Sequence, residues 1–356
     1  MRSALVGIVL ALGGCSGDDG SRGGSASPGI GDGGDGQVTG TAGGDTAGGP
    51  GGGTASGTGG TGGTSADAGA DGSTGDGPKF DLPPTPDVPA DDGCQAIDFM
   101  FVIDNSISMS DQQTALKAAF PLFMATISET LPTTDYQIMV VDTDAAGRCA
   151  PGVCTHATCQ EANQYACGNQ FVACDTIRGA GVVHPAGQEA TNGMCSVFGN
   201  NRYIIEGEPD LSGTFSCMAS VGLAGHQSER PMDGMVEAVS PALLGPGGCN
   251  TGFIRDDAIL VVTFLSDDPN VEDQNTAQQT YDALVAAKNG NADAIVMLGL
   301  TPGFDGCTAS AGAHWAELIG LFGESGFAGS ICEPDYAPFF DEAVGIIADT
   351  CQGLEG

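Results

Sequence analysis

Short, nearly continuous apolar runs alternate along this chain with longer segments in which apolar residues recur every three or four positions. The runs are rich in β-branched and aromatic residues, which is typical of strands buried on both faces of a parallel sheet. We expect such strands at 97–103, 136–141, 258–265 and 294–300 and a shorter one at 329–332. The periodic segments predict amphipathic helices at 110–131, 231–244, 276–288, 314–322 and 336–351.

The alternation of strands and helices predicts an α/β fold with a doubly wound, mainly parallel sheet and helices on both of its faces. Residues 145–216 break this alternation. They are rich in glycine, cysteine and polar side chains and show no clean period, apart from a strand-like piece at 202–205. We interpret 145–216 as a cysteine-rich insertion at the carboxyl edge of the sheet, because it follows a strand directly. Pro121 is expected to kink or split the helix at 110–131.

The first 93 residues contain too few large apolar side chains to build a core. Residues 1–14 combine Arg2, an apolar run and two glycines, the pattern of a secretory signal that is too short to span a bilayer. Residues 15–93 are mostly small and polar and cannot offset the entropy of ordering. We therefore predict a disordered tether, with an r.m.s. span of roughly 50 Å for a Gly-rich coil. It leads into one large domain at 94–356.

Residues 12–15, Leu-Gly-Gly-Cys, resemble the lipobox of bacterial lipoproteins. The resemblance implies cleavage before Cys15 and a lipid on its thiol. It also implies an exported protein that contacts the membrane through this lipid alone. By the same resemblance, Ser16 after the cysteine favours the outer membrane or cell surface over the inner membrane. The alternative is an ordinary signal peptide in which Cys15 is incidental.

Acidic residues dominate the predicted domain. Residues 94–356 contain 33 Asp and Glu against 7 Lys and Arg, a formal charge near −26. Such a domain repels nucleic acid and anionic membrane surfaces, and it favours cations or basic partners. Solubility outside the cell accounts for the acidity equally well.

Twelve cysteines follow Cys15, an even number in a chain predicted to be exported, so disulfides are the default expectation. Spacing does not define their pairing. The twelve are Cys94, Cys149, Cys154, Cys159, Cys167, Cys174, Cys195, Cys217, Cys249, Cys307, Cys332 and Cys351.

The expected order of elements suggests two pairings and leaves the others open. Cys94 with Cys351 would join the two ends of the domain, and Cys307 with Cys332 would join neighbouring loops at strand ends. The alternative for part of the insertion is a zinc site. Its ligands would be Cys154, His156, Cys159 and Cys167.

Oxygen-bearing side chains directly follow the first strand. Asp104, Ser106 and Ser108 are spaced at i, i+2 and i+4, just before the helix that begins near Ser110. Open α/β sheets bind their ligands at this carboxyl edge. One carboxylate and two hydroxyls form a hard donor set that suits Mg²⁺, Ca²⁺ or Mn²⁺. The alternative is that the serines only cap the helix.

Asp-x-Ser-x-Ser after an apolar strand resembles the metal-ion-dependent adhesion site of von Willebrand factor type A domains, which also occur in integrins. The resemblance implies a Rossmann-like fold with a short antiparallel edge strand, for which 202–205 is the candidate. It also implies a divalent cation, Mg²⁺ or alternatively Mn²⁺ or Ca²⁺, held by Asp104, Ser106 and Ser108.

In such domains a carboxylate from the loop after the fourth strand completes the site, usually through water. Asp267 matches that position, and Asp268 is the fallback. The family also supplies a threonine from a loop before a central helix, but the corresponding loop here, 221–229, contains none. Ser228 or Glu229 would substitute for it, or water would fill the position, or the site would bind its cation more weakly than is usual for the family.

The resemblance predicts a non-enzymatic lipoprotein that binds an acidic side chain of a partner protein through the cation. Two alternatives stay open. Asp142-Thr143-Asp144 after the second strand resembles the nucleophile loop of haloacid-dehalogenase-type phosphatases, with Asp142 as nucleophile, Asp144 as acid/base and Mg²⁺ between them. Lys288 would be the lysine that such phosphatases usually have. The other alternative is a scaffold whose metal only stabilises the sheet edge.

Overall fold

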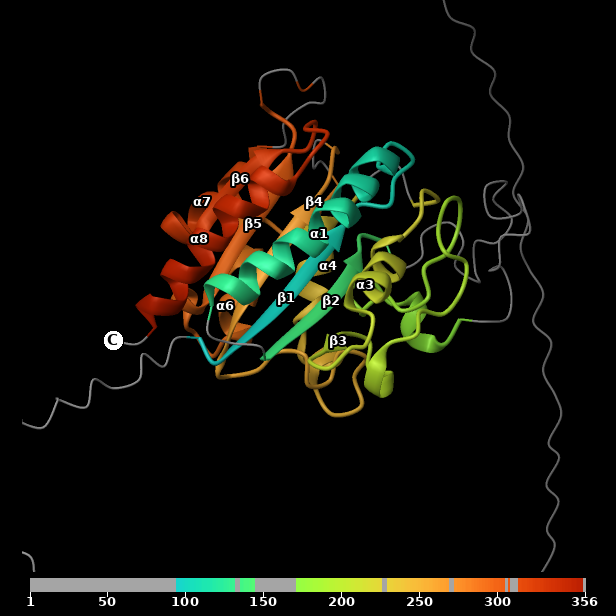
Figure 1. Cartoon of the computed structure of the whole chain (residues 1–356), viewed down its shortest axis with the longest axis horizontal. Helices are drawn as coiled ribbons and strands as arrows, with labels where there is room; N and C mark the ends of the chain where they lie inside the picture. The colour runs from blue at the N-terminus through green and yellow to red at the C-terminus, as the bar shows by residue number, and fades with distance from the viewer. Residues whose placement is uncertain are drawn as a thin grey trace, which may run out of the picture. The chain divides into compact units, whose positions relative to one another are not determined.

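A six-stranded sheet forms the centre of the structure, a computed structural model in which residues 94–131, 135–144, 171–225, 229–268, 272–304, 307 and 313–354 are described (Figure 1). Its strands are β1 (Ala96–Ile103), β2 (Asp135–Asp142), β3 (Ile204–Ile205), β4 (Ala258–Leu265), β5 (Ile295–Thr301) and β6 (Gly326–Ser330). The strand order is β3-β2-β1-β4-β5-β6. All neighbours are parallel except β2 and β3. The doubly wound α/β fold and the antiparallel edge strand are thus confirmed.

Helices cover both faces of this sheet. On one face the core includes side chains of α1 (Ser110–Thr130), α3 (Leu211–Ala219) and α8 (Ala337–Gly353). On the other face it includes α4 (Pro231–Ala238), α6 (Ala277–Ala287) and α7 (Ala313–Leu321). In Figure 1, α1 crosses in front of the strands, whereas α4 lies behind them. Helices on both faces are needed because β1, at the centre of the sheet, is buried along its whole length.

The register aligns the strand ends. Ile103, the last residue of β1, pairs with Asp142 at the end of β2 and with Leu265 at the end of β4. Leu265 in turn pairs with Leu300 of β5. The loops that follow these strands therefore start at one level, at the carboxyl edge of the sheet.

The predicted helix at 231–244 is two helices, α4 and the short α5 (Pro241–Leu244). The break has a local cause. Ser240 has φ −66° and ψ 148°, an extended conformation. A residue before proline is forced towards this conformation because the proline ring clashes with a helical backbone. Pro121 does not split α1, which runs as one helix of 21 residues.

Helix α3 (Leu211–Ala219) begins within the segment 145–216 that the sequence indicated to be aperiodic and ends three residues beyond it. It reads Leu-Ser-Gly-Thr-Phe-Ser-Cys-Met-Ala, which contains few strong helix formers. Asp210 caps its first turn by accepting a hydrogen bond from the Gly213 N–H. The ring of Phe215 stacks on Phe120 of α1, with centroids 3.6 Å apart. Tertiary burial therefore stabilises a helix that local propensity does not predict.

Other elements differ from the predictions mainly at their ends. Strand β6 begins at Gly326, three residues before the predicted start, and α6, α7 and α8 begin and end within two residues of the predicted bounds. Within the described residues no helix is both long enough and apolar enough to cross a membrane. The predicted signal, Cys15 and the tether at 15–93 lie outside the described residues.

Four disulfides connect described cysteines. Cys94 pairs with Cys351 and Cys307 with Cys332, as the order of elements indicated. Two further pairs, which spacing did not reveal, are Cys174–Cys249 and Cys195–Cys217. The first of these ties the described part of the insertion to the loop before β4. The remaining cysteines lie outside the described residues, together with His156 and the alternative zinc site: Cys149, Cys154, Cys159 and Cys167.

Replacing Cys94 and Cys351 together by alanine should lower the free energy of unfolding by about 3–5 kcal/mol, because their disulfide closes a loop of 257 residues in the unfolded chain. The control is the Cys195/Cys217 double alanine variant, whose loop spans 22 residues. It should lose roughly 2 kcal/mol less. Urea unfolding followed by circular dichroism measures both. An equal or smaller loss for the Cys94/Cys351 variant would contradict the expectation.

Candidate metal centre

Asp104 lies where β1 ends, and its position is fixed by the sheet. Its N–H donates to the Leu265 carbonyl at 3.0 Å, which extends the pairing of β1 with β4 by one residue. The side chain is fully buried. Oδ1 accepts a hydrogen bond from the Ser106 N–H at 2.7 Å, and Oδ2 accepts one from the Ser266 hydroxyl at 2.6 Å. Burial raises the pKa of Asp104 to about 7, and the charge of Asp267 adds to the rise.

Ser106, Ser108 and Asp267 meet beside it. The hydroxyl oxygens of Ser106 and Ser108 are 3.1 Å apart, and the Ser108 hydroxyl donates to Asp267 Oδ1 at 3.0 Å. Neighbouring oxygens around an octahedral Mg²⁺, with Mg–O distances of 2.0–2.1 Å, lie about 3 Å apart. The spacing of these three oxygens therefore fits a shared divalent cation. The structure thus brings together all four residues of the predicted core of the site.

Hydrogen bonds from the Gln113 side chain and from the Gly225 backbone hold the loop after β1. Gln113 of α1 donates its amide to the carbonyl oxygens of Asp104 and Gly222, at 3.2 and 2.9 Å. The Gly225 N–H donates to the Asn105 carbonyl at 2.9 Å. A Cβ on Gly225 would lie 2.0 Å from Asn105 Oδ1, so only glycine allows this close approach. Residues 222–225 are therefore packed directly against the loop that carries the candidate site.

Glu229 is the residue of that segment that reaches the site. Its side chain is fully buried, and one carboxylate oxygen contacts the Thr143 hydroxyl. The other oxygen, Oε1, has no hydrogen-bond partner within the described residues. Burial raises the pKa of Glu229 to about 10, and the charges of Asp104, Asp144 and Asp142 contribute. Of the two predicted substitutes for threonine, Glu229 is buried near Asp104, whereas Ser228 is outside the described residues.

Further carboxylates surround this group. Asp144 accepts a hydrogen bond from the Asn105 side chain at 3.0 Å, and Asp268 lies 3.5 Å from the Glu229 nitrogen. Asp142 is buried at the end of β2. Within the described residues no group of three or more His, Cys, Asp and Glu side chains is arranged to hold a metal by itself. The candidate centre instead combines carboxylates with serine hydroxyls.

The phosphatase hypothesis required Lys288 near Asp142, and the structure places it elsewhere. The Lys288 ammonium donates to the Ala258 carbonyl at 2.6 Å and to the Arg255 carbonyl. Ala258 begins β4, so this ammonium lies at the amino edge of the sheet. An eight-residue strand separates the two edges by about 23 Å. Lys288 and Asp142 therefore cannot act on one phosphate, and the proposed role of Lys288 was wrong.

Asp233 and Asp273 join two loops that carry site residues. The Asp273 carboxylate accepts hydrogen bonds from the N–H groups of Asp233 and Met232, at 2.8 and 3.3 Å. The Asp233 carboxylate accepts hydrogen bonds from the N–H groups of Gln274 and Asn275, at 3.0 and 2.9 Å. The first turn of α4 and the loop after β4 therefore hold each other in place. We call this reciprocal pair of caps the clasp.

The pH dependence of stability tests the clasp. Burial raises the pKa of Asp273 to about 7, and the neighbouring Asp233 charge adds to the rise. The folded state therefore binds this proton more tightly than the unfolded state does, and the contribution of Asp273 to stability falls as the pH rises from about 4 to 7. Asp273→Asn should remove this loss, which is on the order of 2 kcal/mol after allowance for partial exposure.

The measurement is urea unfolding of both proteins at several pH values between 4 and 8. The stability of Asp273→Asn relative to wild type should improve as the pH rises, whatever its absolute cost in lost hydrogen bonds. Asp341→Asn, on the exposed side of α8, is the control and should follow the wild-type curve. A difference between Asp273→Asn and wild type that is constant with pH would exclude this role for Asp273.

Comparisons with known proteins place the chain in no family. No family model and no curated protein matches the sequence. Among solved structures, proximal thread matrix protein 1 from the mussel byssus is 15% identical, with a TM-score of 0.37, over 72% of this chain and 47% of that chain. A structure of that protein "with zinc occupied MIDAS motif" gives a TM-score of 0.35 at 15% identity, over 72% of this chain and 46% of that one. The pilus adhesin SpaC from Lactobacillus rhamnosus GG is 11% identical, with a TM-score of 0.35, over 72% of this chain and 30% of that one. The chain thus spans less than half the length of these proteins.

Proposed function

We propose that this protein binds a divalent cation at the carboxyl edge of its sheet and, through that cation, an acidic side chain of a partner protein. Asp104, Ser106 and Ser108 would hold the cation, with Asp267 beside them. Mg²⁺ is the favoured cation, with Mn²⁺ or Ca²⁺ as alternatives, because every donor is a hard oxygen. The observation that carries the proposal is the hydrogen bond between Ser108 and Asp267, which joins residues 159 positions apart.

The surroundings of Glu229 support cation binding independently. A buried carboxylate oxygen without a partner is costly, and a bound cation would satisfy it. A carboxylate at this place also changes the chemistry relative to a threonine. Once a cation displaces the Glu229 proton, the carboxylate adds negative charge beside the cation, which strengthens cation binding and weakens the attraction of the bound cation for an acidic partner. We therefore expect tight cation binding with modest affinity for the partner.

We also propose that the protein is exported and attached to a membrane by a lipid. The pattern at 12–15 supports export and lipid attachment at Cys15, and the residues from there to 93 would serve as a flexible tether. The domain would then work at the outer membrane or cell surface, held by the lipid alone. A recognition domain on such a tether searches a volume around its anchor, which suits capture of a partner on a facing surface.

Isothermal titration of the full-length protein with Mg²⁺, Mn²⁺ and Ca²⁺ tests the cation site. Asp104→Ala should weaken binding by at least 100-fold, because it removes the buried central carboxylate. Glu229→Gln should weaken binding about tenfold, because it keeps the shape and removes the charge. Asp341→Asn is the matched control for loss of one acidic group and should bind as wild type does. Unchanged affinity in Asp104→Ala would refute the site, and turnover of p-nitrophenyl phosphate by that variant would favour the phosphatase hypothesis.

A second measurement separates recognition from a purely structural cation. Mn²⁺ bound to the protein enhances water proton relaxation as long as it keeps exchangeable water. Added acetate should reduce this enhancement in a saturable manner, because its carboxylate takes a coordination position in place of water. Acetamide, which has the same shape and no charge, is the control and should have little effect. If acetate and acetamide both reduce the relaxation enhancement equally and weakly, the cation does not bind carboxylates and has only a structural role.

A further inference from the structure

A cavity of about 430 Å³ lies between the first turns of α1 and the segment that joins β6 to α8. Asp111 and Gln112 of α1 line one side, and Ile331, Glu333 and Tyr336 line the other. Asp111 follows Ser108 by three residues, so their Cα atoms are at most about 11 Å apart. The cavity therefore opens beside the candidate metal centre. It contains none of the four residues that form the core of that centre.

Three acceptors in the lining of this cavity have no partner among the described residues, whereas its Thr114 and Tyr336 hydroxyls already donate to backbone carbonyls. The carboxylates of Asp111 and Glu333 are exposed and form no ion pair or hydrogen bond with any described residue. Gln112 contributes a buried amide oxygen, Oε1, that likewise has no partner among the described residues. No Lys, Arg or His belongs to the lining. A ligand that completes this lining must donate hydrogen bonds and carry positive charge.

Much of the remaining lining is apolar, and two hydroxyls in it, on Thr114 and Tyr336, are bonded to backbone carbonyls. Ala115, Ala118 and Ile331 provide aliphatic surface. The Tyr336 hydroxyl donates to the Ile331 carbonyl at 2.9 Å, and Cys332 at the rim is fixed by its disulfide to Cys307. A long side chain with an aliphatic stem and a cationic end matches such a lining, because the stem covers apolar surface while the head group meets the acceptors. Preformed walls reduce the ordering cost of binding.

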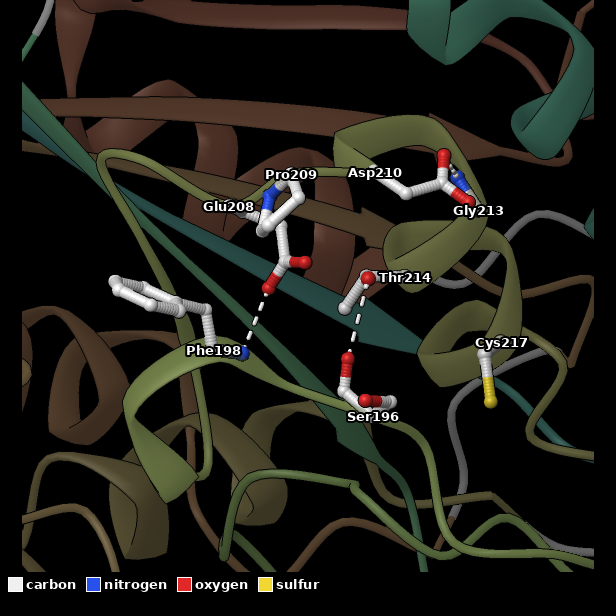
Figure 2. A pocket seen from close by; sticks show the side chains of 8 residues that line it. All are labelled: Ser196, Phe198, Glu208, Pro209, Asp210, Gly213, Thr214 and Cys217. Atoms are coloured by element: carbon white, nitrogen blue, oxygen red, sulfur yellow. Dashed lines mark hydrogen bonds between the residues drawn. The ribbon is translucent and has the colours of Figure 1, made fainter.

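In a second cavity, of about 420 Å³, the acidic side chains do have hydrogen-bond partners (Figure 2). It also contains two carboxylates, but both are bound to the backbone. Glu208 accepts a hydrogen bond from the Phe198 N–H at 2.8 Å, and Asp210 accepts one from the Gly213 N–H at 3.0 Å. Those carboxylates have structural roles as caps. Only in the cavity beside α1 are both acidic groups left for a ligand, among the described residues.

We propose that the cavity between α1 and the β6–α8 segment receives a Lys or Arg side chain of a protein partner. The charge of the domain fits this occupant, because a strongly acidic surface attracts basic segments. If the proposed cation site binds an acidic residue of the same partner, the two recognised side chains lie on one short segment, since the two sites are neighbours. That last statement rests on the proposed function, whereas occupation of the cavity by a cationic side chain does not.

Backbone amide NMR of the full-length protein tests the inference with N-acetyl-arginine amide as the probe, in EDTA so that no divalent cation takes part. The probe should shift the amides of Asp111, Gln112 and Glu333 in a saturable manner. N-acetyl-citrulline amide has nearly the same shape without the charge, and it should bind at least tenfold more weakly. The Asp111→Asn, Glu333→Gln double variant should lose about tenfold in affinity for the arginine probe. The Asp341→Asn, Glu342→Gln double variant removes two exposed acidic groups of α8 and should bind as wild type does.

Three results would overturn the inference. They are equal binding of the citrulline and arginine probes, equal loss of affinity in the two double variants, and shifts that do not saturate. Asp104→Ala should bind the arginine probe normally. This variant separates the two hypotheses. If the cation-site hypothesis is wrong, Asp104→Ala still binds the arginine probe. If the cavity hypothesis is wrong, Asp104→Ala still loses cation binding.

Discussion

The common level at which β1, β2 and β4 end is the constraint on which the candidate site depends. Ile103 pairs with both Asp142 and Leu265, and the hydrogen bond from Asp104 to the Leu265 carbonyl extends that alignment by one residue. A slip of β1 by one residue would turn its side chains to opposite faces. The buried apolar residues on both faces forbid such a slip, since each face is covered by helices. The hydrophobic core therefore fixes where the polar site forms.

Buried carboxylates at the two edges of the sheet have different hydrogen-bond partners. At the amino edge, Asp98 is buried but accepts hydrogen bonds from the Arg255 backbone N–H and side-chain Nε, both at 2.8 Å. At the carboxyl edge, Asp104 is bound by hydroxyl and backbone donors, and no basic side chain among the described residues bonds to it or to Glu229. Buried charges are normally paired or coordinate metals. Burial raises the pKa of both Asp104 and Glu229 and so favours their protonated forms, and a bound cation would have to replace these protons.

The site also depends on segments that are distant in the sequence. The clasp formed by Asp233 and Asp273 ties the loop after β4 to the first turn of α4. Gln113 ties the loop after β1 to the segment that precedes α4. These hydrogen bonds connect the segments that carry Asp267, Ser106 and Glu229. A preorganised arrangement of this kind reduces the free energy that ligand binding must supply.

Several features could not be predicted from the sequence, for particular physical reasons. Helix α3 has weak propensity and forms because Phe215 packs against Phe120. The break between α4 and α5 is different, because its cause, the effect of Pro241 on Ser240, is local and could have been predicted. Glu229 was only a secondary candidate ligand, because the loop around it offered no spacing signal. Its raised pKa arises from burial and from the charges of residues 85 or more positions away, such as Asp104 and Asp144.

By itself the sequence determined the fold class, the main strands and the Asp-x-Ser-x-Ser loop, because these depend on residue type at short spacing: apolar runs for strands, helical periods, and oxygen ligands directly after a strand. It also indicated two disulfides from the order of elements. Only the tertiary structure decided that Asp267 meets Ser108, that Glu229 is buried beside Asp104, and that Lys288 lies at the opposite edge. These are contacts between residues far apart along the chain, and they are set by strand register and helix packing, which no local pattern encodes.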